Sequence, residues 1–322
     1  MTTTQPRPNG RARTRSPWEV FRLFLRLGCT SFGGPTAHLG YFRDEFVEKR
    51  KWFTDKRYAD LVALCQFLPG PASSQVGMAI GLQRAGYLGM VLAWVGFTLP
   101  SVLLMVAFAL GVAQLGDIGE AGWLLGLKAA AVAVVAQAVY GMTKSLVTDK
   151  IRAAVAVAAL VLVLLVPHPF IQVGAIVLGI LVGLAFLHDS EDTGTDTDAD
   201  TDAGSGSRAL GLVCLALFFL LLFVLPLIAQ LIGTTGAEIF GTFYRAGALV
   251  FGGGHVVLPL LETVTVGPGL VDHDTFLAGY GAAQAMPGPL FTFACYLGAS
   301  AEGVNWVLGA TIATIAIFLP AA

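Results

Sequence analysis

Long runs of apolar residues follow one another along most of the chain and are separated by short polar segments. A membrane-spanning helix needs roughly 20 predominantly apolar residues, and six runs reach or approach that length. They are Tyr87–Leu115, Ala121–Met142, Ile151–Val166, Phe170–Leu187, Ala209–Ile232 and Val304–Ala322. The third and fourth runs are short and are joined by Pro167-His168-Pro169. The pattern predicts an all-α polytopic membrane protein rather than a soluble helical domain.

Two shorter apolar runs, 59–68 and 73–82, flank the segment Pro69-Gly70-Pro71. Neither run is long enough to cross a bilayer. Proline removes a backbone donor and glycine permits a sharp turn, so we expect a re-entrant hairpin that enters and leaves on one side. Such broken backbone at membrane depth is tolerated only where it faces protein or a watery cavity. A single kinked helix of about 25 residues is the alternative reading.

Three short motifs occur twice in the chain, each pair separated by nearly the same number of residues. The separations are 219 for Arg26 with Phe32-Gly33-Gly34 and Arg245 with Phe251-Gly252-Gly253, 218 for Gln66 with Pro69-Gly70-Pro71 and Gln284 with Pro287-Gly288-Pro289, and 220 for Leu99-Pro100 and Leu319-Pro320. A long repeat with helix breaks at matching places is typical of transporters whose site lies between the two halves. The second Pro-Gly-Pro segment also lies between short runs, which favours the hairpin.

Composition and charge extend this interpretation to the topology. Hydrophobic residues make up 56% of the chain and charged residues 12%, outside the soluble range. Lys and Arg gather between Arg22 and Arg57, and none follows Arg245. Basic loops stay cytoplasmic, so we expect a cytoplasmic N-terminus. An odd number of crossings between the two motif copies then makes the repeats inverted, with broken helices at the Pro-Gly-Pro motifs.

The domain boundaries follow from the same composition. We expect a disordered cytoplasmic tail (1–16), an N-terminal transporter domain (17–187), an acidic flexible linker (188–208) and a C-terminal transporter domain (209–322). The first half continues for another 87 residues after Pro100, whereas only two residues follow Pro320. We therefore expect the second domain to be incomplete.

The first Pro-Gly-Pro segment offers a site for a small oxyanion. Pro71 suits the first position of a helix, and a helix start leaves about four backbone N–H groups unpaired beside a partial positive charge. Ser73, Ser74 and Gln75 add side-chain donors there. In the second copy only Thr292 offers a hydroxyl, so we expect the first half to contribute more polar contacts. The alternative is that both serines merely cap the helix.

Arg26 and Arg245 are the charges expected to compensate a bound anion, because an arginine fork suits a tetrahedral oxyanion. An intramembrane arginine is costly and is by default a functional hypothesis, although Arg26 could instead snorkel to lipid headgroups. The remaining binding candidates are Gly33, Gly34, Gln66, Gly70, Gly252, Gly253, Gln284 and Gly288.

Ion or proton coupling needs groups that change charge. His38, His255 and Glu262 follow the glycine motifs and are the coupling candidates. Asp44 and Glu45, among several basic residues, are expected to be solvated loop charges.

No sequence feature indicates a cofactor, a metal site or a nucleic-acid partner. The four cysteines have no metal-ligand spacing, and neither His-Glu-x-x-His nor Gly-x-Ser-x-Gly occurs, so a membrane-embedded hydrolase is disfavoured. The expected partners are a small inorganic oxyanion and the lipid bilayer, and a homodimer is left open. A passive anion channel that uses the same helix breaks remains an alternative to a transporter.

The combined motifs resemble the chromate ion transporter family in its two-domain form. The resemblance rests on Arg26 with Phe32-Gly33-Gly34-Pro35, Trp52-Phe53-Thr54-Asp55 and Gln66-Phe67-Leu68-Pro69-Gly70-Pro71, and on Phe251-Gly252-Gly253-Gly254, Pro259 and Pro287-Gly288-Pro289. It covers the chain from about residue 17 to its end. It implies an inner-membrane carrier that exports chromate and confers chromate resistance, with sulfate as the natural analogue. The residues alone reach only a small oxyanion bound between two halves.

Overall fold

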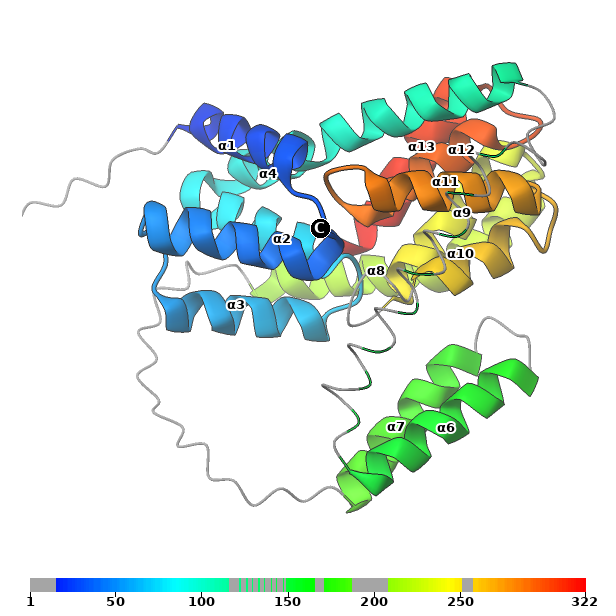
Figure 1. The fold of residues 1–322 in the computed structure, drawn as a ribbon. Coiled ribbons are helices and arrows are strands. Elements are labelled where there is room, and N and C mark those ends of the chain that lie inside the picture. The colour runs from blue at the N-terminus through cyan, green and yellow to red at the C-terminus, as the bar shows by residue number, and fades with distance from the viewer. Residues whose placement is uncertain are drawn as a thin grey trace, which may run out of the picture.

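The computed structural model describes residues 16–115, 149–165, 171–186, 208–250 and 257–322, with single positions between 116 and 148. Every regular element within these ranges is helical (Figure 1), as the apolar pattern predicted. The expected N-terminal tail, the linker and the run Ala121–Met142 lie outside the described ranges, apart from a few single positions.

The first half contains helices joined by short breaks. They are α1 (Pro17–Thr30), α2 (Gly34–Arg43), a π-helix (Asp44–Lys49), α3 (Asp55–Phe67) and α4 (Ala72–Leu115). Thr54 caps α3 by accepting a hydrogen bond from the N–H of Arg57 at 3.3 Å. The chain is not helical from Leu68 to Pro71, so the two short runs are separate helices and not one kinked helix. Non-helical backbone at Ala85 and Gly86 divides α4 again.

The second half follows the same order of elements. They are α9 (Thr235–Ala248), α10 (Val257–Thr265), α11 (His273–Ala285), a 3₁₀ turn (Leu290–Thr292), α12 (Phe293–Ser300), α13 (Trp306–Phe318) and a final 3₁₀ turn (Leu319–Ala321). Asp272 caps α11 and accepts from the N–H of Thr275 at 2.8 Å. This cap is 218 residues after Thr54 and begins the matching helix of the second half.

Three helices lie between the halves in sequence: α6 (Lys150–Leu165), α7 (Ile171–Phe186) and α8 (Arg208–Ile232). Helices α6 and α7 pack against each other, and α8 packs on α9, where the Tyr244 hydroxyl donates to the carbonyl oxygen of Phe218. Among the described residues, two helical stretches are long and apolar enough to cross a membrane, Ala72–Gln114 and Gly211–Ala229. The other predicted runs that the structure describes form shorter helices.

Glycines let the helices of each half approach closely, and they do so at matching places. A Cβ at Gly28 would lie 2.6 Å from the carbonyl oxygen of Phe97, and one at Gly247 would meet the carbonyl oxygen of Ile317. Further along, Gly81 lies against Gly89 and Gly298 lies against Gly309. Because only a residue without Cβ fits at such contacts, α1 packs on α4 as α9 packs on α13.

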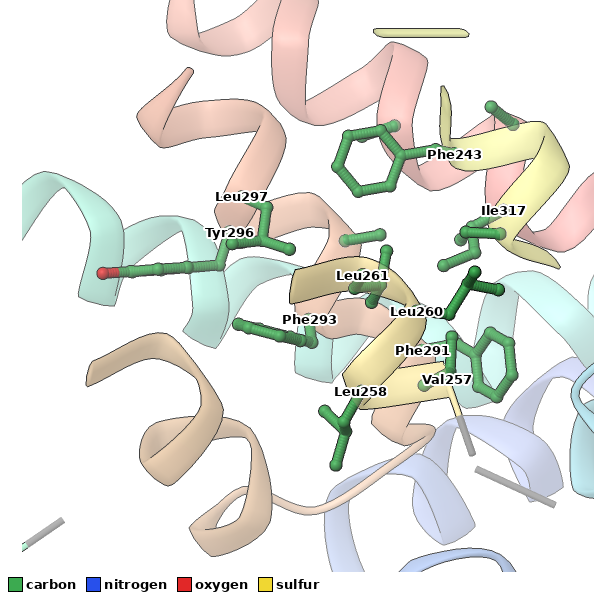
Figure 2. Close-up of a cluster of buried hydrophobic side chains, with 14 of the residues drawn as sticks. Phe243, Val257, Leu258, Leu260, Leu261, Phe291, Phe293, Tyr296, Leu297 and Ile317 are labelled. Atoms are coloured by element: carbon green, nitrogen blue, oxygen red, sulfur yellow. The ribbon is translucent and has the colours of Figure 1, made fainter. Parts of the chain in front are cut away.

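Each half has its own buried core. In the first half the ring of Phe24 lies 5.3 Å from Phe46 and 5.6 Å from Phe42, measured between centroids. In the second half Phe291 and Phe293, just after the Pro-Gly-Pro segment, pack with Leu260 and Leu261 of α10 and Ile317 of α13 (Figure 2). These cores hold the helix breaks in place.

Candidate functional site

Two backbone hydrogen bonds connect the halves, and each joins a Pro-Gly-Pro glycine to the residue before the other half's Phe-Gly-Gly motif. Gly70 donates its N–H to the carbonyl oxygen of Val250 at 2.8 Å. Gly288 donates its N–H to the carbonyl oxygen of Ser31 at 2.9 Å. We call the four segments that meet here, 31–33, 68–71, 249–250 and 286–289, the crossover. The motifs of the repeat therefore converge, each copy against the opposite copy.

The crossover requires glycine at both central positions. Gly70 has φ 115° and Gly288 has φ 95°, in the region that L side chains rarely adopt. A Cβ at Gly70 would lie 3.0 Å from the Cβ of Ala321, and a Cβ at Gly288 would lie 3.0 Å from the Cβ of Ser101. Both conformation and space thus exclude a side chain at these positions.

The start of α4 presents buried polar side chains beside the first Pro-Gly-Pro segment. Ser73, Ser74 and Gln75 are 3%, 2% and 7% exposed. The amide nitrogen of Gln75 donates to the carbonyl oxygen of Pro69 at 2.9 Å, so this side chain stabilises the break itself. The hydroxyl of Ser74 has no hydrogen-bond partner. The prediction that hydroxyls gather at this helix start agrees with this placement.

At the second Pro-Gly-Pro segment the single hydroxyl is already hydrogen-bonded. The Thr292 hydroxyl donates to the carbonyl oxygen of Pro289 at 2.7 Å and lies 2.6 Å from the hydroxyl oxygen of Ser101. Both side chains are buried. The sequence analysis missed Ser101, although it follows the repeated Leu-Pro pair and its counterpart Ala321 is not polar.

Further buried polar groups of the first half lie around the crossover. The hydroxyls of Ser31 and Thr98 and both ring nitrogens of His38 have no hydrogen-bond partner. The His38 ring stands edge-on to Phe97, with 5.2 Å between centroids. His38, a coupling candidate, is therefore close to the crossover, whereas Ser31 and Thr98 were not singled out from the sequence. Only their position beside repeated motifs could have indicated them.

Arg26 lies away from the crossover. It precedes Gly28 by two residues, which is about 200° around a helix, and Gly28 faces α4. Arg26 is exposed and lines a cavity of about 210 Å³ together with Asp44, Glu45 and other residues of α1, α2 and the π-helix. The second arginine, Arg245, is half-buried in the last turn of α9, where a cation also favours the helix dipole. The structure thus gives the two matching arginines different surroundings.

One expectation about acidic residues is wrong. Asp44 and Glu45 do not lie in a loop but begin the π-helix, and Glu45 is only 9% exposed. Its carboxylate accepts a hydrogen bond from Nε of Arg50 at 2.7 Å and lies 3.7 Å from Nζ of Lys49. Packing against α1 buries this carboxylate, and its two cations compensate it.

The remaining candidates are distributed unevenly. Gln66 is exposed, and the half-buried Gln284 donates to the hydroxyl of Tyr280 at 3.1 Å. Gly33 and Gly34 both have positive φ, 96° and 74°, in the loop that begins α2. Glu262 is 46% exposed and lies 3.4 Å from Nδ1 of His273. Gly252, Gly253 and His255 lie outside the described residues.

Comparisons with known proteins agree with one another. A family model described as chromate transporter matches residues 18–185 and 237–322. The chain is 30% identical over 310 residues to the chromate transport protein of Pseudomonas aeruginosa, covering 94% of this chain and 70% of that protein. It is 29% identical to the chromate transport protein of Cupriavidus metallidurans (94% and 71%) and 28% identical to a probable chromate transport protein of Synechococcus elongatus (94% and 73%). No solved structure matches the chain significantly.

Proposed function

We propose, because the chain belongs to the chromate transporter family, that it is a secondary active transporter that exports chromate across the cytoplasmic membrane. Sulfate, which has the same shape and charge, is the expected analogue. The family match and the apolar helices support an integral membrane protein. The export direction, the energy source and the membrane are part of this proposal.

The crossover is the observation that carries the proposed site. Helices that break inside a transporter place backbone dipoles and polar side chains near the middle of the membrane. Here the break before α4 brings the first-turn N–H groups, Ser73 and Ser74 to a buried position. Neutral donors of this kind suit a tetrahedral dianion, because each donor contacts one of its oxygens without requiring a full counter-charge.

We propose further that the halves, 17–187 and 209–322, are inverted repeats joined by the linker 188–208. Reciprocal contacts are what a two-fold relation between halves produces. The pair of hydrogen bonds at Gly70 and Gly288 has this form, and so does the pair of close contacts at Gly28 and Gly247. The clustering of Lys and Arg before Arg57 favours an axis in the membrane plane, with the N-terminus cytoplasmic.

Alternating access then requires the crossover to open on one side at a time. Both backbone hydrogen bonds are formed here and Ser73 and Ser74 are buried, which describes an occluded arrangement. Breaking the bond at Gly70 or at Gly288 would expose the helix start to one side. In this scheme Arg245 compensates the anion's charge, and Arg26 attracts the anion from its separate cavity. His38 is the coupling candidate nearest to the crossover.

The test is chromate uptake into inverted membrane vesicles, measured with and without a proton gradient. Accumulation above the external concentration supports active transport, and uptake that stops at equilibrium supports a passive channel instead. Competition by sulfate but not by phosphate supports a site for fully deprotonated dianions. Absence of chromate uptake by the folded protein would contradict the proposed function.

A further inference from the structure

The two Pro-Gly-Pro segments have matching surroundings but differ in one pair of side chains. Gly288 lies against Ser101, and Gly70 lies against Ala321, with the same 3.0 Å approach in each case. Ser101 and Ala321 each follow a Leu-Pro pair of the repeat. Thr292 stands four residues after Gly288, and Ser74 stands four residues after Gly70. Ser101 with Thr292 therefore corresponds to Ala321 with Ser74.

In the second half this pair forms a closed hydrogen-bond network. The hydroxyls of Ser101 and Thr292 are 2.6 Å apart, and Thr292 also donates to the carbonyl oxygen of Pro289. Thr292 is 1% exposed and Ser101 is 2% exposed. A donor already committed to a carbonyl is not free to bind an anion unless that bond breaks.

In the first half the same place lacks the second hydroxyl. Ala321 provides a methyl group where Ser101 provides an oxygen, and the Ser74 hydroxyl is 98% buried with no partner. Leaving a buried hydroxyl unpaired costs free energy, so such groups call for an explanation. The adjoining amide of Gln75 is bound to Pro69 and does not satisfy it. A ligand that accepts hydrogen bonds would satisfy both Ser74 and the first-turn N–H groups of α4.

We infer that the transported oxyanion is held at the first Pro-Gly-Pro segment alone, by the Ser74 hydroxyl and the N–H groups that begin α4. The Ser101–Thr292 hydrogen bond closes the equivalent place in the second half. The inference rests on the proposed function and adds that one of two matching half-sites binds the tetrahedral dianion. Ala321 determines this asymmetry, because a hydroxyl there would occupy Ser74.

The test uses four variants of the full chain in the vesicle uptake assay, with the KM for chromate as the readout. Ser74→Ala removes the donor and should raise KM about tenfold or more, as expected for a lost hydrogen bond to a charged group. Ala321→Ser should raise KM similarly by pairing with Ser74. Ala322→Ser, the same change at the exposed neighbouring residue, is the matched control and should keep the wild-type KM.

The double variant Ser74→Ala with Ala321→Ser separates this mechanism from general damage. If Ala321→Ser acts through the Ser74 hydroxyl, the double variant should have the KM of Ser74→Ala, with no further increase. Additive increases would overturn the inference. So would a wild-type KM in Ala321→Ser, or a KM increase in Thr292→Ala as large as in Ser74→Ala.

Two further measurements keep the outcomes distinct. Thermal unfolding in detergent shows whether each variant is folded, and only folded variants enter the comparison; Ala321→Ser is the smallest change and tests the inference even if Ser74→Ala does not fold. No chromate uptake by folded wild-type protein would mean that the proposed function fails. Uptake by the wild type with equal KM in all variants would mean that only the assignment to Ser74 fails.

Discussion

The backbone N–H of Gly288 donates to the carbonyl oxygen of Ser31 at 2.9 Å, joining the second Pro-Gly-Pro segment to the first Phe-Gly-Gly motif. The bond from Gly70 to Val250 repeats this relation with the halves exchanged. Neither bond can form in a chain with only one copy of the motifs. Repetition of the motifs is therefore explained by a structure in which each copy completes the other.

Alanine at Gly70 or Gly288 should destabilise the protein. Each position has a φ near 100°, for which an L residue loses about 1–2 kcal/mol, and the added Cβ would also press on Ala321 or Ser101. Thermal unfolding in detergent measures the loss. Gly269→Ala is the control, because Gly269 has φ 78° but open space around it. Equal losses at all three positions would mean that the close contact contributes nothing.

Alanine at Gly28 and at Gly247 should reduce stability by similar amounts. Each new methyl group would meet a backbone carbonyl of the facing helix, and overpacking of this kind typically costs about 1–3 kcal/mol. The same unfolding assay applies. Gly111→Ala in α4 is the control, since no atom lies within 4 Å of its Cβ position and alanine favours the helix by about 1 kcal/mol. Tolerance of alanine at Gly247 alone would contradict equivalent packing in the two halves.

Arg245→Ala should abolish chromate resistance while the protein remains in the membrane. Arg245 is half-buried, and a cation in such a place interacts strongly with an anion because the surroundings screen it weakly. Growth on chromate and the amount of protein in the membrane fraction are the two measurements. Arg22→Ala, an exposed residue of α1, is the control and should retain resistance.

Arg26→Ala should have a smaller effect than Arg245→Ala. Arg26 is exposed beside Asp44 and Glu45, so water and neighbouring charges screen it. We expect a higher KM at high ionic strength for the wild type, and less dependence on salt in the variant. Complete loss of resistance in Arg26→Ala, with normal resistance in Arg245→Ala, would reverse this assignment of roles.

The cap of α11 should make stability depend on pH. Burial would raise the pKa of Asp272, but hydrogen bonds from the hydroxyl and N–H of Thr275 outweigh it and lower the pKa overall. A carboxylate with a lowered folded-state pKa stabilises the protein fully above its ordinary pKa of about 3.9. That stabilisation is lost as the pH falls through the folded-state pKa.

Two variants test this cap. Asp272→Ala should lower the free energy of unfolding by about 1 kcal/mol at neutral pH. Asp272→Thr reproduces the cap that Thr54 provides for α3, so it should retain most of the stability without the decline in acid. Unfolding curves at neutral and acidic pH make the comparison, and an unchanged acid decline in Asp272→Thr would assign the decline to another group.

Much of the local structure could be predicted because it depends on residues that are close in sequence. The helices end near Pro69-Gly70-Pro71 and Pro287-Gly288-Pro289 because proline lacks an N–H and glycine permits positive φ. The hydroxyls of Ser73 and Ser74 could be placed at a helix start for the same reason. The family could also be identified, because short motifs at a constant separation are visible in the sequence itself.

Surroundings set by distant segments were predicted less well. The charge pattern around Glu45 suggests a loop, yet the π-helix packs this carboxylate against Arg50 and away from water. Arg26 and Arg245 occupy matching positions in the repeat, yet only Arg245 is half-buried, because α9 has α8 packed against it. A repeat in sequence does not carry its neighbours with it.

The sequence by itself determined the helical class, the places where the helices break and the two copies of the motifs, since each follows from residue chemistry over a few positions. Only the tertiary structure decided that Gly288 meets Ser31, that Ser101 pairs with Thr292 and that Ser74 is left opposite Ala321. These partners lie far apart along the chain, and hydrogen bonding and burial depend on which surfaces packing brings together. The difference between the two half-sites is therefore a property of the fold.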